Sequence, residues 1–202
     1  MQQIQQWGAH VLFHSGDFDY HDSPPSFFEQ RDSIFNFSYP YLTTIGNHEL
    51  TMWNQGYESG LADRMHAIKT DTPLRCWGQI GVNMACVYGG EVGGVVIVMS
   101  GVGTCGTGHE AFIEETLTQY SRASWKLCMW HKVQHLYQTS DNSDATGYGV
   151  YDICRRHGAL VMTAHTHSYS RTVAMSDFAT QEIADPEKDD IHIAPGGYLH
   201  GF

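Results

Sequence analysis

Residues 158–170 read GALVMTAHTHSYS, an apolar run that ends in two histidines two positions apart. The apolar part has the length and composition of a buried strand. Four more segments have an apolar run of this kind: AHVLFHSGDFDY (9–20), SYPYLTTIGNHE (38–49), GGVVIVMSGVGT (93–104) and SWKLCMWHKVQH (124–135). The sequence therefore predicts five strands, and four of them run into residues that can bind a metal.

Helix-like segments lie between these runs. Residues 24–39 have apolar residues at helical spacing and prolines at the start, and residues 108–122 are acidic early and basic at the end. Residues 147–158 end in basic residues and Gly158, a C-cap residue. This alternation predicts an α/β domain. Glycine-separated runs in residues 73–99 indicate antiparallel hairpins, so we expect a mixed sheet.

The composition is that of a globular protein, with 202 residues, 42% hydrophobic residues and a formal net charge of −11. This charge argues against a basic nucleic-acid-binding face. No apolar run is long enough to span a bilayer, and the first residues have no signal-peptide pattern.

Five cysteines are scattered without a CxxC pair, and their odd number leaves at least one unpaired if disulfides form. Cys128 and Cys154 lie in or beside apolar stretches, so we expect them to be buried thiols.

Polar side chains that follow strands of an α/β sheet gather at one edge, where ligands bind. The candidates here are Asp17, Tyr20, Asn47, His48, Glu49, His131, His165 and His167. Each alone has an ordinary explanation, because a single histidine after a strand is more often a hydrogen-bonded loop residue. Their repetition after several strands predicts a metal site.

Imidazole, carboxylate, amide and phenol groups without cysteine suit Fe, Mn, Zn or Co. Two ions about 3.5–4 Å apart could hold a phosphoryl group. Residues two apart in a strand point to the same side, so we expect His165 and His167 to face the same side.

The motifs GDFDY (16–20), GNHE (46–49), WH (130–131) and AHTH (164–167), in this order, resemble those of the calcineurin-like metallophosphoesterases. The tyrosine of the first motif and the segment HTHSYSRT (165–172) resemble the purple acid phosphatase branch. The resemblance implies an α/β/β/α sandwich with mixed β-sheets, formed as a single domain over residues 1–202.

The resemblance also implies a dinuclear centre with Fe³⁺ and a divalent ion, which could be Fe, Zn or Mn. Asp17 would bridge the two ions, and Tyr20 and His167 would bind Fe³⁺. The divalent ion would be bound by Asp17 together with Asn47, His131 and His165.

By the same resemblance, the reaction would be hydrolysis of a phosphate ester, as in an acid phosphatase, with metal-bound hydroxide attacking phosphorus. His48 would contact the phosphate and help to protonate the leaving group. Asn47 would also face the substrate. His135 could face the substrate or be an ordinary surface histidine. Tyr169 and Arg171 match a recurring tail of the branch, so we expect them to support the site.

One departure from the family pattern concerns the first metal ligand. The family begins with a DxG-type motif, but no acidic residue precedes Asp17, and residues 1–10 resemble the last turns of the helix that would follow that motif. Residues 191–202 begin like another strand with its glycine loop. We therefore expect a domain that is incomplete at the N-terminus and also at the C-terminus. If the N-terminus is truncated, the protein could be secreted or be located in a vacuole or a lysosome. Such a chain should bind one metal better than two and have reduced activity.

Several alternatives stay open at this stage. A catalytically weakened or inactive relative could use the same fold to bind a partner, and a histidine-rich metal-storage protein is a weaker possibility. The glycine-rich loop GVGTCGTGHE (101–110) could line the pocket or form a plain turn before a helix. The acidic segment 175–190 is expected to be a surface loop. The sequence leaves open the compartment, the oligomeric state, and whether the substrate is a monoester, a diester or a nucleotide.

Overall fold

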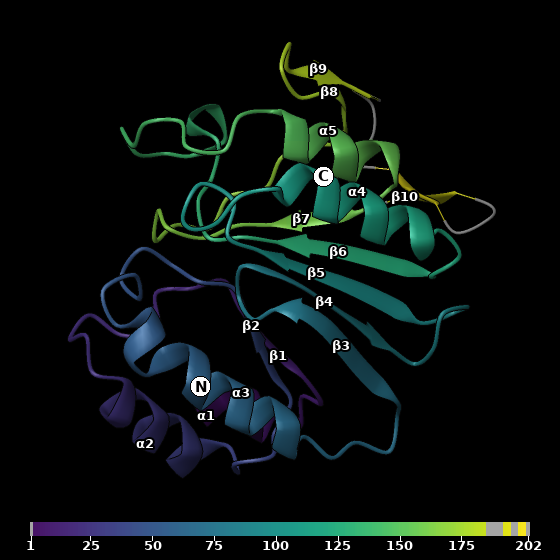
Figure 1. Ribbon diagram of the computed structural model, residues 1–202. Helices are drawn as coiled ribbons and strands as arrows, with labels where there is room; N and C mark the ends of the chain where they lie inside the picture. Colours follow the sequence, from purple (N-terminus) through teal and green to yellow (C-terminus); the bar gives the residue numbers. More distant parts are fainter. Residues whose placement is uncertain (1, 185–191, 195–197, 201–202) are drawn as a thin grey trace.

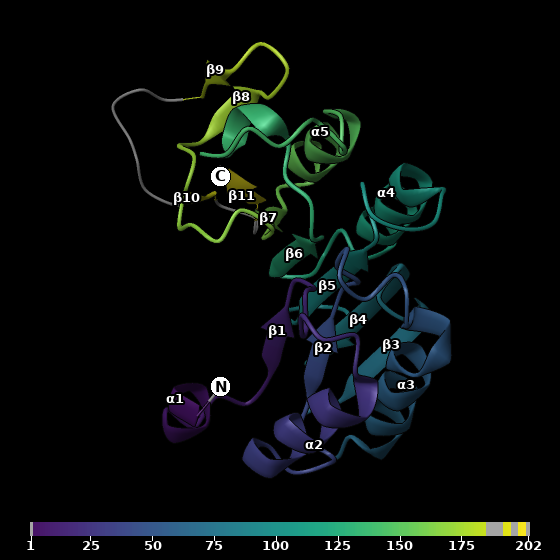
Figure 2. The same ribbon diagram turned by 90° about the vertical axis from the view of Figure 1, so that its left-hand side faces the viewer.

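The protein forms four layers in the order α/β/β/α, as seen in a computed structural model that describes residues 2–184, 192–194 and 198–200 (Figure 1). Helices α4 (His109–Gln119) and α5 (Gly149–Arg156) cover one face of a five-stranded sheet. A small two-stranded sheet lies on its other face, and helices α2 (Pro24–Ile34) and α3 (Tyr57–Ala67) lie outside that sheet (Figure 2). The sandwich with mixed sheets expected from the motifs is confirmed.

The five-stranded sheet is mixed and has the order β3-β4-β5-β6-β7. Its strands are β3 (Leu74–Gln79), β4 (Asn83–Tyr88), β5 (Val95–Ser100), β6 (Trp125–Met129) and β7 (Leu160–Met162). The pairs β3–β4 and β4–β5 are antiparallel, whereas β5–β6 and β6–β7 are parallel. The hairpins predicted from the glycine-separated runs are therefore confirmed.

The remaining two predicted strands form a separate parallel sheet, β1 (Leu12–His14) with β2 (Tyr41–Thr43). The expectation that all ligand-bearing strands belong to one sheet is thus wrong. An isolated bridge between Thr44 and Gly81 joins the two sheets, and the Ile45 N–H donates to the Gly81 carbonyl at 3.0 Å. This link sets the end of β2 beside the central sheet.

Side chains of the central strands alternate between two cores, as the two-residue period of a strand requires. On β5, Val96 and Val98 pack with residues of α4 and α5, whereas Ile97 and Met99 pack between the two sheets. A third core lies between the small sheet and its helices, and it contains Phe18, Phe27, Phe28, Tyr41, Ile45, Trp53, Tyr57, Leu61 and Val82. Each fully buried large side chain contributes about 1.5–3 kcal/mol.

The predicted helices exist with shifted ends. Helix α2 ends at Ile34 because Phe35 is extended, and the fully buried Arg31 guanidinium then donates to the carbonyls of Asn36 and Tyr39. Helix α5 ends at Arg156, just before Gly158 with its φ of +62°. Helix α3 was not predicted from the sequence.

Short elements complete the described part of the chain. They are α1 (Gln2–Gln6), the 3₁₀ turns η1 (Trp53–Gln55) and η2 (His135–Tyr137), and the strands β8 (Met175–Asp177), β9 (Glu182–Ile183), β10 (His192–Ala194) and β11 (Tyr198–His200). The surface loop expected at 175–190 is wrong for its first half, which forms the β8–β9 hairpin, and 185–190 lie outside the described residues. The strand expected after residue 190 is present as β10, and the glycine loop at 195–197 also lies outside them.

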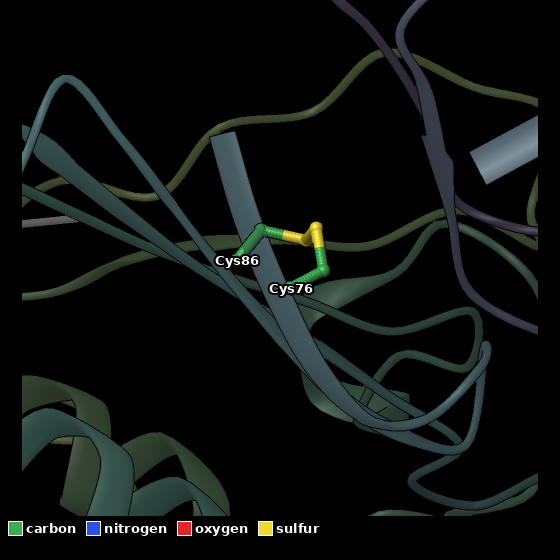
Figure 3. The surroundings of a disulfide bond; sticks show 2 residues. All are labelled: Cys76 and Cys86. Atoms are coloured by element: carbon green, nitrogen blue, oxygen red, sulfur yellow. A yellow bond between two sulfur atoms is a disulfide. The ribbon is translucent and has the colours of Figure 1, made fainter. Parts of the chain in front are cut away.

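A disulfide joins Cys76 on β3 to Cys86, its direct partner on β4 (Figure 3). Cys128 and Cys154 are buried thiols, as predicted, and Cys105 is a half-buried thiol. In the part of the chain that the structure describes, none of the helices has the length and apolar composition of a membrane-spanning segment.

Candidate metal centre

Four predicted ligand side chains converge where β1, β2, β6 and β7 end. The Nε2 atom of His131 lies 3.1 Å from Asn47 Oδ1, 3.1 Å from His165 Nδ1 and 3.3 Å from Asp17 Oδ2. Two of the side chains come from the small sheet and two from the central sheet, so the cluster lies at the seam between the sheets. These are the four side chains predicted for the divalent ion.

The orientation of His131 is fixed by the main chain. Its ring is buried, and Nδ1 lies 2.7 Å from the carbonyl oxygen of Ser15, which can only accept a hydrogen bond. With the proton on Nδ1, the Nε2 atom presents a lone pair to the oxygen and nitrogen atoms around it. Such a second hydrogen bond is what sets the tautomer of a metal-binding histidine.

The cluster fits a transition metal in both chemistry and spacing. Atoms that bind one ion at about 2.1 Å lie roughly 3.0–3.4 Å from each other in octahedral or tetrahedral geometry. The separations around His131 Nε2 fall in this range, and ligand atoms of Asp17, His131 and His165 all lie within 4.8 Å of one another. Two imidazoles, a carboxylate and an amide oxygen suit Zn, Fe or Mn.

The loop that carries Asp17 depends on two glycines. Asp17 has a φ of +57°, and a Cβ on Gly46 would lie 2.3 Å from both the nitrogen and Oδ1 of Asp17. A Cβ on Gly16 would lie 2.5 Å from the nitrogen of Gly46. The motifs GD and GN are therefore required for the close approach of the two loops.

Burial alone would raise the pKa of Asp17, but the neighbouring His131 and the hydrogen bond from the His48 N–H outweigh it and hold this pKa below its usual value. The carboxylate is therefore ionised at neutral pH and available as a ligand.

Glu49 was among the candidate ligands, but its carboxylate is occupied by main-chain amides. It is fully buried and accepts hydrogen bonds from the amides of Asp17, Phe18 and Gly46 at 2.8, 2.6 and 2.8 Å. Burial raises the pKa of Glu49, and these amides counteract part of that effect. The Glu49 carboxylate is therefore directed at main-chain amides and is not part of the cluster of candidate ligands.

The residues predicted for Fe³⁺ are brought together in part. The hydroxyl of Tyr20 lies 2.8 Å from Nε2 of His167, and the ring of His48 lies 4.3 Å from the ring of Tyr20 between centroids. Among the described residues, Asp17, His131 and His165 have candidate ligand atoms within 4.8 Å of one another, and His167 is not part of this group. Burial, followed by the charge of Asp17, raises the pKa of Tyr20, so a phenolate here would need a cation beside it.

The prediction that strand alternation orients His165 and His167 is wrong, although the two side chains do contact different residues. Strand β7 ends at Met162, and both histidines lie beyond it with φ of +71° and +49°. A tight turn, in which the Thr166 N–H donates to the Ala164 carbonyl, directs their side chains, and strand alternation does not apply.

The outer candidates differ in their surroundings. The His48 N–H donates to Asp17 Oδ1 at 3.2 Å, while its ring is half-buried at Tyr20. His135 is exposed in η2, with Nδ1 3.3 Å from Gln134 Nε2. Tyr169 is 92% exposed, and the support expected from it and from Arg171 stays a prediction.

Two residues near the cluster were missed from the sequence. Lys132 Nζ lies 3.0 Å from Nε2 of His165, and burial lowers the pKa of this lysine. His14, at the end of β1, is hydrogen-bonded to the hydroxyl of Tyr41, and burial lowers its pKa to about 4. In the sequence, only their positions pointed to the site. Lys132 is next to the candidate ligand His131, and His14 is three residues before the candidate ligand Asp17.

The glycine-rich loop at 101–110 forms a turn before a helix. The amides of Thr104 and Cys105 both donate to the Gly101 carbonyl, and α4 begins at His109. The side chain of His109 is hydrogen-bonded to Ser100 and Asn83 through Nδ1.

Comparison with curated proteins and with solved structures gave no match. The model of one protein family, described as calcineurin-like phosphoesterase (Metallophos), matches residues 1–169. This match includes all four loops of the cluster. The chain therefore belongs to the calcineurin-like phosphoesterases, a family that hydrolyses phosphoesters with divalent metal ions.

Proposed function

We propose that this chain is an acid phosphatase-like hydrolase of the purple acid phosphatase type, and that its primary metal site is the Asp17, Asn47, His131 and His165 cluster. The observation that carries the proposal is the convergence of four ligand atoms on His131 Nε2, with separations of 3.1–3.3 Å. The nearby Tyr20 and His167 pair supports the choice of branch.

Bound metal ions would neutralise the charge of the phosphoryl group and lower the pKa of a water nucleophile. Asn47, His131 and His165 would hold the divalent ion, and Tyr20 and His167 would hold Fe³⁺, with Asp17 shared between them. In a chain with net charge −11, this concentration of cations would also attract an anionic substrate.

The residues of the chain would then act on the substrate as follows. The His48 ring, beside the exposed Tyr20, would donate a hydrogen bond to a phosphate oxygen and pass a proton to the leaving oxygen. The buried Asp17 carboxylate, fixed by the His48 amide, would keep the ligand atoms in place during turnover. His135 would contact the substrate from η2, where it is exposed.

We further propose that this chain binds one metal more tightly than two. Four side chains of the described residues converge at the divalent site, whereas Tyr20 and His167 have only the shared carboxylate of Asp17 as a third ligand. Metal analysis after purification should give close to one ion per chain, together with reduced turnover of p-nitrophenyl phosphate. Two ions with full activity would refute this proposal.

Two variants and a control test the assignment of roles. His131→Ala should lose the metal and lower kcat by at least about 100-fold, whereas the exposed His66→Ala on α3 should change neither. His48→Ala should abolish turnover but retain the metal. If the unmodified chain binds metal without any turnover of the aryl phosphate, the alternative of a non-catalytic binding protein is favoured.

A further inference from the structure

Glu49 is a buried carboxylate whose partners are amides of the two ligand loops. Oε2 accepts from the N–H groups of Asp17 and Gly46, and Oε1 accepts from that of Phe18. Within the described part of the chain, Glu49 forms no salt bridge with a cationic side chain. Its charge is therefore stabilised by main-chain donors, which have fixed positions.

These hydrogen bonds connect two separate loops. Asp17 and Phe18 follow β1, whereas Glu49 follows β2, so two of the three bonds cross from one loop to the other. A return bond runs from the His48 N–H to Oδ1 of Asp17 at 3.2 Å. Consecutive N–H groups beside a residue with positive φ form a concave anion-binding site, and here the anion is a side chain of the protein itself.

The same arrangement fixes two metal ligands. Asp17 carries one of the bonded amides, and Asn47 lies between Gly46 and Glu49, both of which take part in the hydrogen bonds. A Cβ on Gly46 would lie 2.8 Å from Oε2 of Glu49, so the glycine leaves the space that the carboxylate fills. The positions of the Asp17 and Asn47 side chains are thus tied to a single buried carboxylate.

We propose that Glu49 is a positioning residue of the metal centre, which locks the loop after β1 onto the loop after β2 before any metal binds. Metal affinity then depends on Glu49 although it is not a ligand. This inference rests on the proposed function only in taking the four-residue cluster as the metal site.

The test compares Glu49→Gln with the unmodified chain and with Glu29→Gln, a control on the exposed face of α2. The glutamine has the same shape, but its NH₂ group would face an amide donor, which breaks at least one of the three bonds. Zn²⁺ affinity is measured by competition with a chromophoric chelator, and folding is checked by circular dichroism. We expect the affinity of folded Glu49→Gln to fall by about 10- to 100-fold and that of the control to stay within about twofold.

A folded Glu49→Gln variant with unchanged Zn²⁺ affinity would overturn the proposal. If the variant does not fold, hydrogen exchange of the unmodified, metal-free protein decides. Slow exchange at the amides of Asp17, Phe18 and Gly46 without metal supports the proposal that Glu49 holds the two loops together. Fast exchange that slows only when Zn²⁺ is added overturns it.

The outcome is separate from that of the proposed function. A chain that binds Zn²⁺ through a Glu49-dependent site but does not hydrolyse p-nitrophenyl phosphate would refute the phosphatase activity alone. If the chain is active and its Zn²⁺ affinity is the same with and without the Glu49→Gln substitution, the positioning role alone would be refuted. A chain that binds no Zn²⁺ at all would overturn both.

Discussion

The half-buried histidine at the end of β1 should make the protein sensitive to acid. His14 packs against Phe18 and Tyr41 at ring-centroid distances of 5.3 and 5.8 Å, and burial lowers its pKa from 6.5 to about 4. Between these two pH values the unfolded chain binds a proton at His14 that the folded protein does not. Stability is therefore fully present above pH 6.5 and falls as the pH drops towards 4.

The size of this loss follows from the two pKa values. A shift of one unit corresponds to 1.36 kcal/mol, so the His14 contribution should decrease by about 2 kcal/mol from pH 7 to 5 and by about 3 kcal/mol from pH 7 to 4. This is a large part of the 5–15 kcal/mol that typically stabilises a domain. A cation in the neighbouring metal site would act in the same direction, because it disfavours a charged imidazolium.

The assay is urea unfolding of the metal-free protein at several pH values between 4 and 8, for the unmodified chain and for His14→Phe. Phenylalanine keeps the ring but does not titrate, so the difference in unfolding free energy between the two proteins should shift by about 3 kcal/mol from pH 7 to 4. The same comparison with His66→Phe, at an exposed position, should show a much smaller shift. Parallel curves for the unmodified chain and His14→Phe would refute the reasoning.

Three further predictions concern the loops, the tyrosine and the disulfide. Gly46→Ala should lose metal binding, measured by metal analysis, because its Cβ would lie 2.3 Å from the main chain of the neighbouring ligand loop; full metal occupancy would contradict this. Tyr20→Phe should remove any visible tyrosinate-to-iron absorption band and keep the divalent ion; a band that persists would exclude Tyr20. Replacing Cys76 and Cys86 by serine should lower the unfolding free energy by about 3 kcal/mol, since they close a loop with a sequence separation of 10; an unchanged urea midpoint would show that the bond contributes little.

The strand-end pattern predicted the five strands and four side chains that the structure brings together, because apolar runs and polar termini are local features of a sequence. It did not predict that β1 and β2 form their own sheet, since pairing depends on contacts between distant segments such as Thr44 and Gly81. Helix α3 was missed for a related reason. Gly60 weakens its helical signal, yet the missing side chain lets α3 lie directly on the ring of Phe28.

At the site, the sequence identified residue types but not their hydrogen-bond partners. Asp17, Asn47, His131 and His165 were assigned together, and the structure brings them together. The role of Glu49 could not be read, because a carboxylate in a metal-binding motif resembles a ligand until its amide partners are known. The Ser15 carbonyl that orients His131 is a main-chain atom and leaves no trace in the residue type.

The location of the cluster at the seam between two sheets has a consequence for the choice of ion. Asp17 and Asn47 follow strands of the small sheet, and His131 and His165 follow strands of the central one. The spacing between the sheets depends on the core packed between them, which includes Leu42, Met84, Ile97 and Met129. Zn, Fe and Mn differ only slightly in radius, and close-packed interiors transmit even the volume of one methylene. If the cluster is the metal site that we propose, its ion selectivity would depend on this interior, and conservative core substitutions would change the selectivity while all four ligand residues are retained.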